Sequence, residues 1–174
     1  MHSPLVAALA RTLSRRASES VAWVRFNFRG VGASEGQYDG GRGELDDALA
    51  VVDYMTRRVP GVPVTMCGHS FGAWVAFGVA SQAGRESRID RTVLFGPSAR
   101  LFEFVEPGAE FRLITNIFLG SEDEYCDVAE ARELGRRLGA ERVEVMDGFD
   151  HQFLQGRHRV AELALSSIAP EVTS

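Results

Sequence analysis

Short apolar runs alternate with amphipathic helical patterns along the chain. The apolar runs predict strands over Val21–Phe28, Val62–Cys67, Thr92–Phe95, Arg112–Leu119 and Arg142–Met146. Apolar residues at helical spacing predict helices over Pro4–Ala17, Glu44–Arg58, Phe71–Gln82, Val128–Leu138 and Arg157–Ile168. Strands separated by helices of this length are joined by right-handed crossovers, which make the strands parallel. The predicted fold is therefore α/β, a three-layer sandwich with helices flanking a mostly parallel sheet of about five strands.

Length and charge narrow this prediction. The 174 residues, 45% hydrophobic and 25% charged, fit one soluble domain spanning residues 1–174 without a separate lid. A formal net charge of −5 argues against nucleic acid or an anionic membrane as a partner, because neither would be attracted overall. Every apolar run is also far shorter than the roughly 20 residues that span a bilayer.

The two cysteines, Cys67 and Cys126, point to a reducing, cytoplasmic setting. Cys67 ends a predicted buried strand, where a cysteine is usually a small core residue rather than a disulfide partner. Neither cysteine lies at zinc-ligand spacing from a histidine. We therefore expect no metal and no organic cofactor.

The first twenty residues raise an alternative to a domain helix. They contain three arginines and several serines with no acid before Glu19, a composition that resembles an organelle transit peptide. Their apolar residues nevertheless fall at helical spacing and lead straight into a predicted strand. We therefore expect a helix of the domain here.

The strongest chemical signal is the pentapeptide Gly-x-Ser-x-Gly at residues 68–72, between a predicted strand and a predicted helix. A serine on such a turn projects its hydroxyl above the sheet, and the flanking glycines let backbone approach closely. The helix start also directs free N–H groups at an anion forming there. Ser70 is therefore a candidate nucleophile, provided that a base and an acid follow in the chain.

Two later loops supply those partners. Residues 120–124 follow one predicted strand and offer several acids, and His151 follows the last strand. The order serine, acid, histidine is that of α/β-hydrolases. Neutral imidazole can accept the serine proton, and a carboxylate can hold the imidazole in the required tautomer. His69, inside the pentapeptide, is expected to be structural. The acid stays open at this point among Glu122, Asp123, Glu124 and Asp127.

Five ordered segments resemble the α/β-hydrolase superfamily, and more narrowly a small lidless bacterial subgroup of predicted hydrolases. They are residues 25–36 (RFNFRGVGASEG), 43–48 (GELDDA), 68–74 (GHSFGAW), 120–123 (GSED) and 148–153 (GFDHQF). The resemblance implies Ser70 as nucleophile, His151 as base, Asp123 as acid and the backbone N–H of Phe71 as an oxyanion donor. It also implies action on an ester, thioester or amide bond of a small-molecule substrate.

One departure from the family pattern leads to further expectations. In the family a strand and a His-Gly or Gly-Gly loop precede the first helix, and that loop donates the second oxyanion N–H. The resemblance therefore implies that the N-terminal strands are missing here, which would expose a sheet edge and favour a homodimer. The alternative function is a catalytically impaired α/β-hydrolase-like domain that serves binding or assembly.

Two other stretches have features that could bind a nucleotide or a substrate. Residues 30–36 carry glycines after a strand, but their spacing differs from a dinucleotide fingerprint and the acidic Glu35 would repel a pyrophosphate. Nucleotide binding is therefore not expected. In the loop Gly96–Glu110, four apolar residues can form either a substrate-pocket wall or core: Leu101, Phe102, Phe104 and Val105.

Overall fold

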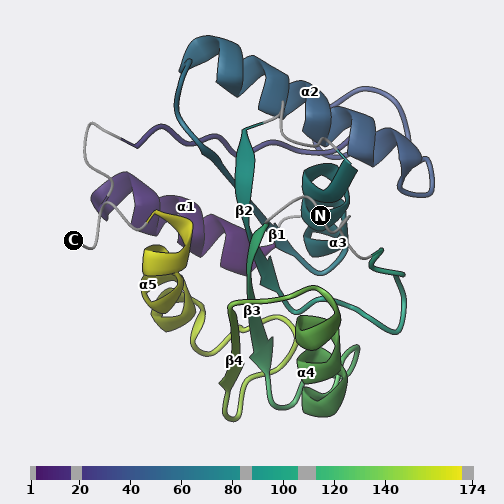
Figure 1. Ribbon diagram of the computed structural model, residues 1–174, viewed down its shortest axis with the longest axis vertical. Coiled ribbons are helices and arrows are strands. Elements are labelled where there is room, and N and C mark those ends of the chain that lie inside the picture. The colour runs from purple at the N-terminus through teal and green to yellow at the C-terminus, as the bar shows by residue number, and fades with distance from the viewer. Residues whose placement is uncertain (1–2, 17–20, 83–87, 106–112, 170–174) are drawn as a thin grey trace.

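The structure is a computed structural model that describes residues 3–16, 21–82, 88–105 and 113–169. Among these residues, helices and strands follow one another in the order α1 (Pro4–Arg16), α2 (Arg42–Arg58), β1 (Val64–His69), α3 (Phe71–Gln82), β2 (Ile89–Phe95), β3 (Ile114–Gly120), α4 (Val128–Arg137), β4 (Arg142–Met146) and α5 (Arg157–Ile168) (Figure 1).

The four strands form one parallel sheet in the order β1-β2-β3-β4. Their register places His69 beside Phe95, and Gly120 beside Met146. The carboxyl ends of all four strands therefore meet at one edge of the sheet. Loops that leave this edge can bring residues distant in sequence together, which is where ligands bind in open α/β sheets.

Helices cover both faces of the sheet (Figure 1). α1 and α5 pack on one face, and α2, α3 and α4 lie on the other. Side chains alternate accordingly along β2: Val93 and Phe95 join the core beneath α1 and α5, whereas Leu94 joins the core on the opposite side. This is the predicted three-layer α/β architecture. Among the described residues, no helix is long and apolar enough to cross a membrane.

The described part of the N-terminal segment, α1, is a helix of the domain, as expected. Leu5 and Ala8 of α1 are fully buried in the core that they share with α5. Arg15 and Arg16, on the outer side of α1, lie 3.7 Å from Glu162 of α5. Two of the three arginines that gave the segment its transit-peptide composition thus lie beside the neighbouring helix.

The predicted strand Val21–Phe28 is wrong: residues 21–28 form no strand and pair with no sheet edge, so the described sheet has four strands, not five. A strand exists only where a neighbour accepts its backbone hydrogen bonds, and apolar alternation alone does not supply that neighbour. Side-chain packing holds this segment instead. Phe26 and Phe28 pack against the core, whereas Trp23 and Val24 are 40% and 45% exposed.

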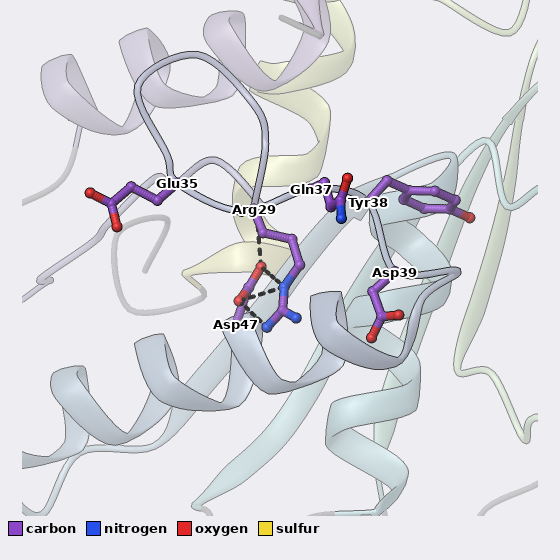
Figure 2. A pocket seen from close by; sticks show the side chains of 7 residues that line it. Arg29, Glu35, Gln37, Tyr38, Asp39 and Asp47 are labelled. Atoms are coloured by element: carbon purple, nitrogen blue, oxygen red, sulfur yellow. Dashed lines mark hydrogen bonds and ion pairs between the residues drawn. The ribbon is translucent and has the colours of Figure 1, made fainter.

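The glycine-rich loop that follows is tied to the start of α2 by side chains. The Arg29 guanidinium pairs with Asp47, 2.8 Å away, and the Arg29 backbone N–H donates to the same carboxylate at 2.8 Å (Figure 2). A Cβ at Gly43 would lie 1.9 Å from the guanidinium, so glycine makes room for it. Glu44 is buried and accepts the N–H groups of Asp39 and Gly41. The segment Gly43–Asp47 therefore serves to lock this loop.

Candidate active site

Ser70 stands between β1 and α3 in the left-handed backbone region, with φ of 57°. That conformation is strained for a residue with a side chain, and such strain is typical of a serine on a sharp strand-to-helix turn. The Ser70 N–H donates to Phe95 O of the neighbouring strand at 2.9 Å, which anchors the turn. Phe71 begins α3, so its N–H is one that the helix itself cannot satisfy.

The two glycines of the pentapeptide are not equivalent. A Cβ at Gly68 would lie 1.9 Å from Gly72 O, so the turn closes only because residue 68 has no side chain. A Cβ at Gly72 would meet nothing within 4 Å. The expectation that both glycines permit close backbone approach is therefore correct for Gly68 and wrong for Gly72, whose Cα faces open space.

The fold brings Ser70, His151 and Asp123 into one hydrogen-bonded chain. His151 Nε2 lies 2.9 Å from Ser70 Oγ, and His151 Nδ1 lies 2.8 Å from Asp123 Oδ2. Since a carboxylate only accepts, Nδ1 carries the ring proton and Nε2 is left with its lone pair toward the serine. Ser70 therefore donates its hydroxyl proton to Nε2. This arrangement can transfer the serine proton to the imidazole.

Among the four acids that the sequence left open, the structure places only Asp123 against His151. Its side chain is fully buried, and its other oxygen accepts the Tyr125 N–H at 2.8 Å. Glu122 and Glu124 are exposed, and Asp127 caps α4 and pairs with Arg100. Position on the loop thus separates these acids, since Asp123 alone turns inward beneath the histidine.

Glycines also let the histidine and acid lie close to the sheet. Gly96, which follows β2, has φ of 49°, and a Cβ there would lie 3.1 Å from both Asp123 Oδ2 and His151 Nδ1. At Gly120, a Cβ would lie 2.1 Å from Phe149 O in the loop that carries His151. The Tyr125 ring covers the imidazole edge-on, with centroids 4.7 Å apart. The acid–histidine pair is consequently shielded from water.

His69 supports the loop that carries His151. Its Nε2 lies 2.9 Å from His151 O, and its Nδ1 lies 3.0 Å from Ser3 Oγ at the start of α1. A carbonyl only accepts, so Nε2 carries the proton and Ser3 donates to Nδ1. Burial lowers the pKa of His69, which favours this neutral form. The expected structural role is thus observed, although no sequence signal linked His69 to Ser3.

Ser98 was missed by the sequence analysis. It is fully buried just beyond β2, and its Oγ lies 3.2 Å from Ser70 Oγ. The rule that residues following parallel strands gather at one edge applies to Ser98 as it does to His151. A serine after a strand is too common to be singled out on that ground, and the contact becomes visible only in three dimensions.

The four apolar residues of the Gly96–Glu110 loop were expected to form either core or a wall of a substrate pocket, and the structure places them differently from one another. Phe104 is core, buried against Phe77, whereas Leu101 and Val105 are 59% and 70% exposed. Phe102 packs beside Phe71 with the two rings tilted and their centroids 5.4 Å apart, and it is the member placed next to the nucleophile turn. Residues 106–110 of the loop lie outside the described residues.

A hollow of about 480 Å³ lies between residues 29–39 and the start of α2 (Figure 2). It is lined by the loop that Arg29 and Asp47 lock, and Tyr38 connects it to the nucleophile turn, with its ring 5.8 Å from that of Phe71. Tyr38 itself is 66% exposed. Within the part of the chain that the structure describes, no three His, Cys, Asp or Glu side chains gather as a metal site.

Comparisons with known proteins agree with this fold. The family model described as serine aminopeptidase, S33 matches residues 1–105. An α/β serine hydrolase homologue from Coxiella burnetii is 26% identical with a TM-score of 0.79, over 97% of this chain and 78% of its own. A lidless α/β serine hydrolase from Xanthomonas campestris is 24% identical with a TM-score of 0.82, over 100% of this chain and 76% of its own.

A protein of Rickettsia prowazekii, described as uncharacterized, is 29% identical over an alignment of 142 residues. The match covers 75% of this chain and 57% of that protein. The chain thus spans little more than half of this relative. The family match covers more than half of the chain and includes Ser70, and the observed α/β fold agrees with it. The chain belongs to the serine aminopeptidase S33 family of α/β-hydrolases.

Proposed function

We propose that this protein is a serine hydrolase that cleaves an ester, thioester or amide bond of a small substrate through an acyl-enzyme. The observation that carries the proposal is the hydrogen-bonded chain from Asp123 through His151 to Ser70, with distances of 2.8 and 2.9 Å. The strained backbone of Ser70 and the family match also support the proposal. A hydroxyl that donates to a buried, correctly oriented imidazole is the arrangement that nucleophilic acyl transfer needs.

The residues of the site have separate roles in the proposed reaction. Ser70 Oγ bonds to the carbonyl carbon while its proton passes to His151 Nε2, and His151 then returns that proton to the leaving group. Asp123 keeps the imidazole in its tautomer and stabilises the imidazolium that forms. The N–H of Phe71, at the start of α3, donates to the oxyanion. Water, activated by His151, then releases the acyl group.

A fluorophosphonate probe followed by mass spectrometry tests this proposal directly. We expect labelling of Ser70 in the wild-type protein, none in Ser70→Ala and slow labelling in His151→Ala. The alternative, a catalytically impaired domain for binding or assembly, predicts a well-folded protein that the probe leaves unlabelled. That result would refute the catalytic proposal.

Substrate size can be examined with p-nitrophenyl esters of increasing chain length. Phe102 and Phe71 form an apolar surface at the nucleophile turn, so we propose that acyl chains longer than acetate are favoured. An activity that stays flat or falls beyond acetate would contradict an apolar acyl site. We also propose a reducing, cytoplasmic setting, which is supported by two free cysteines, Cys67 and Cys126. The expectation that Cys67 is a core residue is wrong, because Cys67 is exposed on β1, whereas Cys126 is buried.

A further inference from the structure

Ser98 is a buried polar side chain directed at the reacting centre. It is 0% exposed, and its hydroxyl oxygen lies 3.2 Å from Ser70 Oγ. A buried hydroxyl without a hydrogen-bond partner is destabilising, so most buried hydroxyls have one. The partner recorded for the Ser98 side chain is the candidate nucleophile itself.

The direction of this hydrogen bond follows from Asp123. The carboxylate accepts from His151 Nδ1, so Nε2 accepts the Ser70 proton. The single proton of the Ser70 hydroxyl is thereby committed to the imidazole. Toward Ser98, Ser70 Oγ can only accept, and the Ser98 hydroxyl must donate.

We propose that Ser98 is a further catalytic residue, whose hydroxyl donates to Ser70 Oγ and stabilises the negative charge that this oxygen carries in the reaction. The inference rests on the proposed serine hydrolase function. Two partners on different strand ends, Ser98 after β2 and His151 after β4, also hold the Ser70 side chain toward the imidazole. A fixed nucleophile requires less reorganisation in the attack.

Charge reaches Ser70 Oγ in two steps. In acylation the oxygen loses its proton to His151 as its lone pair bonds to the carbonyl carbon. In deacylation water has added to the acyl carbon, the bond from that carbon to Ser70 Oγ breaks, and the oxygen departs with the electron pair and takes the proton back from His151. Ser98 keeps its own proton throughout. Its donated hydrogen bond acts on the attacking oxygen in the first step and on the departing oxygen in the second.

The test compares Ser98→Ala with Ser98→Cys, which retains similar volume and a weak donor. The matched control is Ser167→Ala, which removes another buried hydroxyl on α5. The readouts are the second-order rate of Ser70 labelling by a fluorophosphonate, and kcat and KM for p-nitrophenyl acetate. Melting temperature is followed in parallel to separate a folding defect from a catalytic one.

We expect Ser98→Ala to slow labelling and kcat on the order of three- to tenfold, the range for one hydrogen bond, with KM unchanged. Ser98→Cys should fall between alanine and wild type, and Ser167→Ala should keep wild-type rates. Labelling and kcat within twofold of wild type in Ser98→Ala would overturn the role of Ser98 alone. Wild-type protein that is never labelled at Ser70 would overturn the proposed function and this inference together.

Discussion

The carboxyl edge of the sheet and the segment formed by residues 21–41 are built by different means, although both flank Ser70. At the sheet edge, ladder hydrogen bonds fix the strand ends, and the loops that follow carry Ser98, Asp123 and His151. In residues 21–41 no ladder forms, and the chain is held by aromatic packing and by the carboxylates of α2.

This difference has a chemical consequence. Parallel strands place their ends at fixed spacing, so side chains that must meet within hydrogen-bond distance are best carried there. A segment held without ladder hydrogen bonds can shape the wall of a hollow, as Tyr38 does, without setting the geometry of proton transfer. The comparison predicts that substitutions of the side chains that meet at the sheet edge damage chemistry. Substitutions that change the backbone turn there, or the contacts of residues 21–41, should damage stability first.

The largest effect is expected from the acid at the sheet edge. Asp123→Asn leaves the volume unchanged but can donate to Nδ1, which would favour the wrong imidazole tautomer. We expect labelling of Ser70 by a fluorophosphonate to slow by about 10³- to 10⁴-fold, with the melting temperature nearly unchanged. The exposed neighbour provides the control, since Glu122→Gln should label at the wild-type rate. Equal rates in the two variants would show that Asp123 does not serve His151.

The turn at the end of β1 provides the next test. Gly68→Ala places a methyl group against Gly72 O, a backbone atom that cannot move aside, and we expect a loss of more than about 3 kcal/mol in the free energy of unfolding. Gly72→Ala is its matched partner, since the new methyl meets nothing. This change in a helix should be neutral or stabilising by about 0.5–1 kcal/mol in urea unfolding. Equal losses in both variants would contradict the packing described for the turn.

For residues 21–41, the most informative substitution is Glu44→Ala in α2, because the Glu44 carboxylate holds this segment. The substitution leaves the N–H groups of Asp39 and Gly41 without their acceptor in a buried site, and we expect a loss of about 2 kcal/mol in urea unfolding. The exposed Glu35 offers a control, because Glu35→Ala should change stability by less than about 0.5 kcal/mol. Labelling of Ser70 in the folded Glu44→Ala protein should fall only slightly. A loss as deep as that of Asp123→Asn would remove the distinction between the two regions.

The smallest effect concerns the pH dependence of stability through His69. Burial lowers its pKa in the folded protein, so below about pH 6.5 the unfolded chain binds a proton that the folded chain does not. Stability should therefore decline as the pH falls from 6.5 toward the lowered folded pKa. In His69→Gln this component is absent, and the free energy of unfolding should depend less steeply on pH between 7 and 5. An unchanged or steeper dependence would show that His69 is not held neutral.

Several elements could be predicted because their signals are local. The bounds of α3, β4 and α5 match the sequence prediction residue for residue, since apolar spacing and turn residues specify each of them without reference to the rest of the fold. Residues 21–28 show the limit. Their apolar alternation satisfies the requirement for packing, but a strand also needs a hydrogen-bonding neighbour, and that depends on the whole sheet.

For the site, the sequence by itself determined the residue types and their order: a serine on a glycine turn, then an acid, then a histidine, each after a strand. The family resemblance already implied Asp123 among the acids, and the tertiary structure shows that it turns inward to His151. Tertiary structure alone decided that His69 holds the backbone of His151. It also decided that Ser98 reaches Ser70 Oγ. The reason is physical: local sequence fixes where a strand ends, whereas the meeting of two side chains depends on the register of strands that lie far apart in the chain.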